Sequence, residues 1–327
     1  MTEYEYPTAE LSPTLTTSYA RALKPARLPQ DFGETSWNDV RPNSTRWQVV
    51  DLVAKRYFYW TARFAATASA AAFAETTAAL EAAFYPGIPV YTNFNNFAGR
   101  SYTPIAGGGN TPNAAMVSPD WFEMGRARGA TLLWTEDWFE DAQAAQWSYY
   151  LSRLRSAARL APEGDVQYGG YVVPRTSGDV IRPDGIVKKV LSVVASGGKA
   201  LKYFMFGPEY LFRGNCYSEV AVSNPRLFAG IAEANGMIGA AEELLWPAIR
   251  VVSEVAILYP RSSQFWDERG TQFPGSIIDN GNSNMDVFTV DYLAEAFGLY
   301  NALALQRNIA VDFVDEDGLL DPAVRAR

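Results

Sequence analysis

The residues best suited to chemistry lie in the stretch 132–139, where an apolar run leads into Glu136 and Asp137 between Trp134 and Trp138. Glycoside hydrolysis needs two carboxyl groups, one as nucleophile or base and one as proton donor. Indole faces pack against the C–H faces of sugars, and apolar walls help to keep one carboxyl protonated. The alternative is a solvated loop acid beside core tryptophans. Because adjacent carboxylates are unfavourable in a core without partners, the pattern favours a site with Glu136 as nucleophile.

The stretch 91–100 carries a second group of candidates, Asn93, Asn96 and Arg100. Asparagine side chains both donate and accept hydrogen bonds, which suits sugar hydroxyls. Asparagines also form turns, and for Asn95 and Asn96 both interpretations stay open. Asn93, Asn96 and Arg100 are therefore candidates for binding substrate, together with Trp134, Asp137 and Trp138 of the first stretch.

A third stretch places Glu209 and Tyr210 after the apolar residues 204–206. Glu209 is a candidate for the lining of a sugar site. An ion pair with Arg213 is the structural alternative. The only cysteine, Cys216, is most simply a small buried residue.

The sequence contains no histidine, and it carries 36 acidic against 28 basic residues. These counts exclude Ser-His-Asp and Cys-His catalysis and histidine-containing zinc sites within the chain. We expect carboxylates to do the chemistry, with no cofactor and no metal. The negative charge argues against a nucleic-acid partner, and no apolar run reaches the length of a membrane span. Residues 1–7 do not resemble a signal peptide, so the default expectation is a cytoplasmic protein.

Strand-like and helix-like segments alternate along the chain, which predicts an α/β fold with parallel strands. The loops that follow the strands are long and polar, as at the carboxyl ends of a TIM barrel. A closed barrel needs eight strands, and only four are predicted in this part of the chain. Residues 1–246 are therefore expected to form the C-terminal half of a (β/α)8 barrel. The predicted strands are 88–93, 131–135, 166–173 and 200–206, and the predicted helices are 47–64, 67–84, 142–160, 183–195 and 224–245, with a short helix that is capped near Ser118 and ends at Gly129.

A boundary is expected at Trp246 and Pro247. Beyond it, residues 251–259 are typical of a strand, residues 287–306 of a helix and residues 309–314 of a strand. This order predicts that residues 247–327 begin a flavodoxin-like α/β domain.

The order of segments resembles glycoside hydrolase family 42, the β-galactosidases with a (β/α)8 barrel and a trimerisation domain. The resemblance implies a carbohydrate substrate, a retaining mechanism and a possible homotrimer. It rests on four segments. Residues 86–97, with Thr92 and Asn93, resemble the fifth barrel strand, and residues 199–206, which follow Gly197 and Gly198, resemble the eighth. Residues 255–260 and 300–315 resemble the opening of the trimerisation domain.

The chain departs from the family pattern at both catalytic positions. The family nucleophile ends the seventh strand, but residues 166–173 are followed by Pro174 and Arg175, and Glu136 would end the sixth strand. No Asn-Glu pair precedes Trp47 to supply the proton donor. Either the chain is a divergent relative with a shifted nucleophile, or it begins after its proton donor and lacks the acid/base on its own.

The sequence thus predicts a glycoside hydrolase that acts on a β-linked galactoside or a related sugar. The alternative is a non-catalytic carbohydrate-binding or assembly protein whose barrel site has degenerated. A third possibility is an α/β protein that binds another small ligand at its strand ends.

Overall fold

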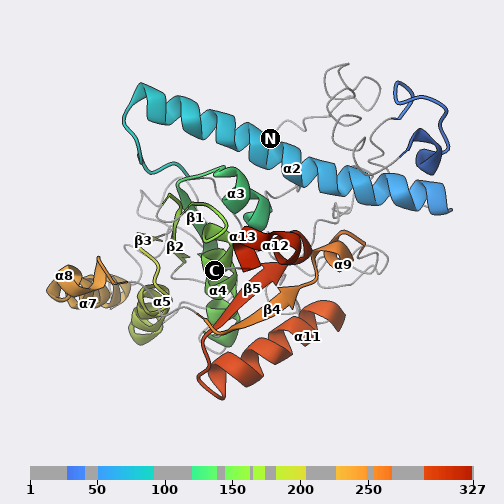
Figure 1. The fold of residues 1–327 in the computed structure, drawn as a ribbon. Helices are drawn as coiled ribbons and strands as arrows, with labels where there is room; N and C mark the ends of the chain where they lie inside the picture. Colours follow the sequence, from blue (N-terminus) through green and yellow to red (C-terminus); the bar gives the residue numbers. More distant parts are fainter. Residues whose placement is uncertain are drawn as a thin grey trace, which may run out of the picture.

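The computed structural model describes residues 28–40, 51–91, 120–137, 144–162, 165–173, 182–203, 226–248, 253–266 and 291–325. These residues form two small parallel sheets surrounded by helices, which confirms the predicted α/β class (Figure 1). None of the described helices combines the length and the apolar character that a membrane span requires.

The first sheet contains β1 (Leu132–Asp137), β2 (Gln167–Val172) and β3 (Ala200–Tyr203), all parallel and in the order β1-β2-β3. All three strands were predicted from the sequence. The predicted strand at 88–93 is not formed over 88–91, where Pro89 has no N–H to donate to a ladder. Instead the carbonyl of Val90 accepts hydrogen bonds from the N–H groups of Thr131 and Leu132. Residues 92 and 93 lie outside the described residues.

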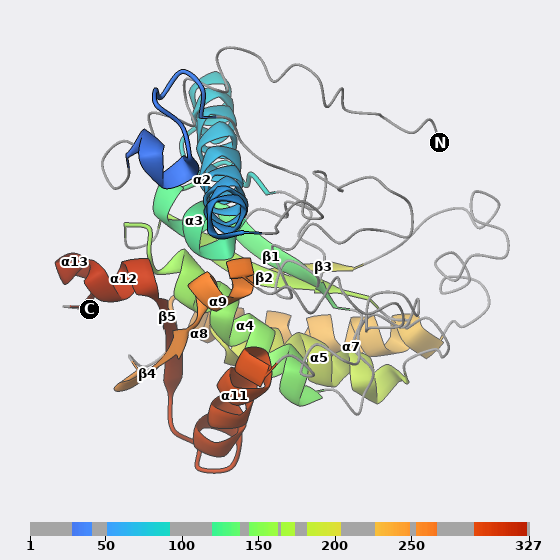
Figure 2. The same cartoon turned by 90° about the vertical axis from the view of Figure 1, so that its right-hand side faces the viewer.

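Two successive helices, α4 (Ala144–Ala158) and α5 (Pro183–Ala195), cover the same face of this sheet. Gly170 of β2 identifies that face, because a Cβ there would lie 2.4 Å from Val193 of α5 and 3.2 Å from Trp147 of α4. Figure 2 shows α4, α5 and α7 (Arg226–Ala240) together on one side of the three strands. The sheet is therefore wound with its crossover helices on one side.

The predicted helix at 224–245 is divided in two. Helix α7 ends at Ala240, and the short helix α8 (Glu242–Leu245) follows. The side chain of Lys199 links the end of α8 and the residues after it to the start of β3. Its Nζ donates hydrogen bonds to the carbonyls of Leu245 and Ala248, each at 2.6 Å.

The amino-terminal part of the described chain is dominated by α2 (Leu52–Ala83), a continuous helix of 32 residues. We predicted two helices here, at 47–64 and 67–84, and the structure shows that this division is wrong. Neither glycine nor proline lies between them, and Thr67 satisfies its hydroxyl by donating to the carbonyl of Arg63 within the helix. Asp51 caps the helix by accepting from the N–H of Ala54 at 2.8 Å.

Helix α3 (Trp121–Ala127) lies between α2 and α4 (Figure 1). Asp120 caps its first turn, rather than the predicted Ser118, by accepting from the N–H groups of Phe122 and Glu123. Gly125 permits the close crossing with α4, because a Cβ there would lie 1.9 Å from the carbonyl oxygen of Ala157.

The second sheet pairs β4 (Val255–Tyr259) with β5 (Val311–Asp315) in parallel. Between them run α9 (Arg261–Trp266), α11 (Asp291–Tyr300) and one turn of π-helix (Asn301–Leu305). The short helices α12 (Glu316–Leu320) and α13 (Pro322–Arg325) follow β5. The predicted strand–helix–strand order is thus present within the described residues.

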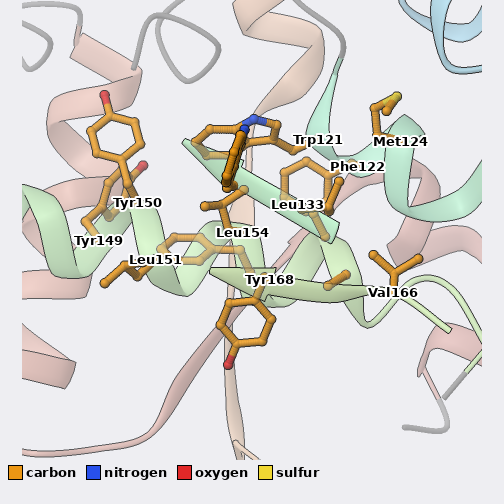
Figure 3. Packing of buried hydrophobic residues seen from close by; sticks show 14 of the residues in the cluster. Trp121, Phe122, Met124, Leu133, Tyr149, Tyr150, Leu151, Leu154, Val166 and Tyr168 are labelled. Carbon is orange, nitrogen blue, oxygen red and sulfur yellow. The ribbon is translucent and has the colours of Figure 1, made fainter. Parts of the chain in front are cut away.

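One hydrophobic core joins the two sheets through α4. On one side, Leu133 and Tyr168 pack with Leu154 of α4, as Figure 3 shows. On the other side, Tyr149 of α4 contacts the rings of Tyr300 and Phe313 at centroid distances of 5.5 and 5.2 Å. Residues before and after Trp246 therefore share a core.

A buried charge network also connects the two parts of the chain. The guanidinium of Arg261, which is only 2% exposed, forms ion pairs with four carboxylates from α3, its N-cap, β5 and α12. Arg63 of α2 adds a pair with Asp317 at 2.6 Å. The carboxylates bound by Arg261 are Asp120, Glu123, Asp315 and Asp317.

Candidate functional site

The candidate site lies at the carboxyl ends of the three parallel strands, where ligands bind in α/β folds of this kind. The register places Glu136 of β1 opposite Tyr171 of β2, and Tyr171 opposite Lys202 of β3. A carboxylate, a phenol and an ammonium thus occupy consecutive positions of one row across the sheet.

Three aromatic rings gather around the Lys202 ammonium. Its Nζ lies 4.4 Å from the ring centroid of Trp134, 4.9 Å from that of Tyr171 and 5.1 Å from that of Tyr91. The rings also contact one another, with Trp134 stacked on Tyr171 at 5.1 Å and tilted against Tyr91 at 4.1 Å. All three distances from Lys202 fall within the range of cation–π attraction.

Strand alternation explains how the sequence builds this group. Successive side chains of a strand point to opposite faces, so Leu133 and Tyr168 on the helix-covered face leave Trp134 and Tyr171 on the other. Gly169 lies opposite Trp134 and has no side chain, which leaves room for the indole to reach Tyr171. A Cβ at Gly169 would also lie 2.2 Å from the carbonyl oxygen of Ala200.

Of the predicted site residues, Trp134 is the one whose side chain is described. It is 3% exposed, so its ring is covered by its neighbours and packs beneath the site rather than facing a ligand. Tyr91 is 47% exposed and offers the accessible aromatic surface of the group.

The two predicted acids, Glu136 and Asp137, are the last two residues of β1. Their backbone lies at the strand end where the sequence analysis expected it. The remaining predicted residues, Asn93, Asn96, Arg100, Trp138 and Glu209, lie outside the described residues.

Sequence reasoning did not select Tyr171 or Lys202. A signal for Lys202 is present, because parallel strands covered by helices are usually continuous apolar runs, and a lysine within one is unusual. Tyr171 carries a weaker signal. It lies two residues after Gly169, so the two residues share the face of the sheet opposite the helices.

The densest cluster of acids elsewhere in the described chain surrounds Arg261, and arginines neutralise it. Within these described ranges, no three acidic, histidine or cysteine side chains are grouped so as to hold a metal ion. Among the described residues, the strand ends are therefore the best candidate site, since Glu136 lies in the row and the half-exposed ring of Tyr91 contacts Lys202 of the same row.

A scan of the chain against protein-family models gives no match, and searches among curated proteins and solved structures give none either. The resemblance to glycoside hydrolase family 42 therefore stays a prediction from the sequence, and the function is argued from the site.

Proposed function

We propose that this protein is a glycoside hydrolase that acts on a β-linked galactoside or a related sugar with retention of configuration. The observation that carries the proposal is the place of Glu136 at the carboxyl end of β1, in register with Tyr171, whose ring stacks on Trp134. In the proposed reaction, the Glu136 carboxylate attacks the anomeric carbon while the bond from that carbon to the leaving-group oxygen breaks, and the leaving group departs as an alcohol after protonation by an acid. Water then hydrolyses the glycosyl ester, which releases the sugar and regenerates the carboxylate.

The winding of the first sheet supports a (β/α)8 barrel as the finer fold. Barrel strands follow one another in sequence order, with every crossover helix on the outer face. The order β1-β2-β3 and the shared face of α4 and α5 agree with that rule. The opposite face, which carries Trp134, Tyr171 and Lys202, would then line the barrel interior.

For the second sheet we propose the start of a flavodoxin-like domain. The parallel pair β4–β5 with α11 between its strands supports this assignment. A homotrimer built through this domain is proposed from the family resemblance.

Tyr91 is the proposed stacking surface for the sugar, because its ring is half exposed beside the buried Trp134. Aromatic faces bind the C–H faces of sugars, and the contact with Trp134 holds Tyr91 in place. The proton donor is not assigned to any of the described residues.

The test is covalent trapping with an aryl 2-deoxy-2-fluoro-β-galactoside, whose glycosyl ester is hydrolysed slowly. Peptide mass spectrometry should locate the ester on Glu136, and Glu136→Gln should abolish labelling and turnover while the melting temperature stays nearly constant. Asp184→Asn, a surface acid on α5, is the matched control and should label normally. Turnover with the ester on another carboxylate would refute the assignment.

Sugar binding without turnover is the second candidate. The observation that favours it is that β2 and β3, as far as they are described, end in Val172 and Tyr203 without a carboxylate. Calorimetric binding of galactosides combined with no hydrolysis and no trapped ester would select this candidate over the enzyme.

A further inference from the structure

Within the part of the chain that the structure describes, Arg153 and Lys202 are each surrounded by several aromatic rings, and their settings differ. The guanidinium carbon of Arg153 lies 3.9 Å from the ring centroid of Tyr259 and 5.2 Å from that of Trp121. Arg153 is 2% exposed in the core between the two sheets, so it is part of the packing. Lys202 is only partly buried, lies at the strand ends and is enclosed together with the half-exposed Tyr91.

The three rings hold the Lys202 ammonium without neutralising it. A lysine ammonium has three N–H donors and no acceptor, whereas ring faces offer electrostatic attraction but poor acceptor geometry. No side chain that the structure describes supplies Lys202 with a carboxylate partner. A positive charge with donors to spare is thus held on the proposed sugar-binding face.

The position of Lys202 relative to Glu136 fits one sugar unit between them. Tyr171 of β2 separates the two residues in the row. Neighbouring strands lie about 4.8 Å apart, so the backbones of Glu136 and Lys202, two strands apart, are separated by about 10 Å. In a pyranose whose anomeric carbon faces Glu136, the exocyclic C6 group on C5 lies on the other side of the ring oxygen from that carbon and can point toward β3.

We propose that Lys202 makes the site selective for sugars that carry an anionic group at C6, either a carboxylate or a sulfate ester. This inference rests on the proposed function, because it assumes that a sugar occupies the row. Aromatic walls exclude water from one side of the ammonium, which strengthens its attraction to an anion. The ammonium is a point charge without the fork of arginine, so it suits both anionic groups.

The net charge of the chain limits the size of such a ligand. With a formal charge of −8, the protein repels long polyanions, while one local cation can hold a single anionic group. The expected ligand is therefore a small glycoside with one acidic sugar at the site, rather than a polyanionic polymer.

The experiment compares the affinities of D-galactose, D-galacturonate and D-galactose 6-sulfate for the full chain by calorimetry. An anionic sugar should bind at least about tenfold more tightly than galactose, because a hydrogen bond to a charged group contributes more than a neutral one. Tighter binding of galacturonate alone identifies a uronic acid site, and tighter binding of the sulfate alone identifies a sulfated-sugar site.

Lys202→Met keeps the length of the side chain and removes the charge, so it should abolish the preference while galactose still binds. Lys202→Arg keeps the charge and should retain the preference. The control is Lys188→Met, which removes the same charge from an exposed position on α5, on the other side of the sheet. It should leave all three affinities unchanged.

The possible failures are distinguishable. If the unmodified chain binds galactose as tightly as both anionic sugars, the role of Lys202 is overturned and the proposed function still stands. A preference that persists in Lys202→Met has the same meaning. If none of the three sugars binds and no aryl galactoside is hydrolysed, the proposed function fails and this inference fails with it.

Discussion

Arg155 of α4 and Asp312 of β5 form a buried ion pair, with Nη2 and Oδ1 2.7 Å apart. Asp312 also binds Arg159, which directly follows the last residue of α4, and Arg155 donates to the carbonyl of Val311 at 2.6 Å. A single carboxylate of the second sheet therefore pairs with two cations, one within and one just after the helix that covers the first sheet.

Replacing Asp312 by asparagine should destabilise the whole fold. Arg155 is 4% exposed at its side chain, and removing one member of a buried pair leaves an uncompensated charge. The expected loss is about 3–5 kcal/mol in the free energy of unfolding, measured by urea titration. Asp184→Asn, which removes an acid from an exposed pair with Arg182, should leave the urea midpoint almost unchanged. Equal effects of the two substitutions would contradict the role of the buried pair.

Gly125→Ala should separate α3 from α4. The new methyl group would collide with the backbone carbonyl of Ala157, which cannot move without shifting the helix. Overpacking of this kind costs about 1–3 kcal/mol or more. Gly236→Ala on α7 is the matched control, since a Cβ there meets nothing within 4 Å. Alanine's higher helix propensity should make that variant more stable by up to about 1 kcal/mol in thermal melts.

Glu81 should contribute to stability only above strongly acidic pH. Its hydrogen bonds with Arg128 and with the N–H of Gly87 lower its pKa from about 4.5 to about 2. Because the folded pKa is depressed, the contribution is complete above the unfolded value and is lost as the pH falls from about 4.5 to about 2. The melting temperatures of the unmodified chain and Glu81→Gln should therefore differ near neutral pH and converge near pH 2. A constant gap between the Glu81 variant and the unmodified chain at every pH would contradict the linkage.

Substitutions at Tyr91 and Trp134 should affect different properties, sugar affinity for Tyr91 and the stability of the fold for Trp134. Tyr91→Ala removes a half-exposed ring and should weaken sugar affinity while the melting temperature changes little. Trp134→Ala removes a ring that is 3% exposed and should cost about 3–5 kcal/mol of stability. Calorimetry with galactose and galacturonate, together with thermal melts, measures both quantities. Unchanged affinity in Tyr91→Ala would remove Tyr91 from the proposed site.

The elements with strong local signals could be predicted from the sequence. Helix α5 was predicted with its observed bounds because Pro183 opens it and the Gly197 turn follows it. Helix α2 was wrongly divided, since its long run of alanine and threonine carries no apolar period that would show where one helix ends. The prediction of a strand at 88–93 was wrong over 88–91. It relied on the pattern of apolar side chains and gave too little weight to Pro89, which has no N–H to donate.

The site could be predicted only in part. Glu136 and Asp137 stand out because an apolar strand leads directly into them. Lys202 and Tyr171 become notable only through the register that brings three strands together, which a sequence read alone does not supply. The buried position of Trp134 likewise depends on Tyr91 and Tyr171, which come from other segments.

The pair between Arg63 of α2 and Asp317 of α12 joins residues 254 positions apart. During synthesis at ribosomal rates, α2 would emerge about 13–50 s before Asp317 exists to bind it. Its early partners are those already made, the small cluster around Phe32 and Val40 that includes Tyr57. Helix α2 is thus made well before the residues that complete its contacts, and its exposed apolar surface is where a nascent-chain chaperone would be expected to bind.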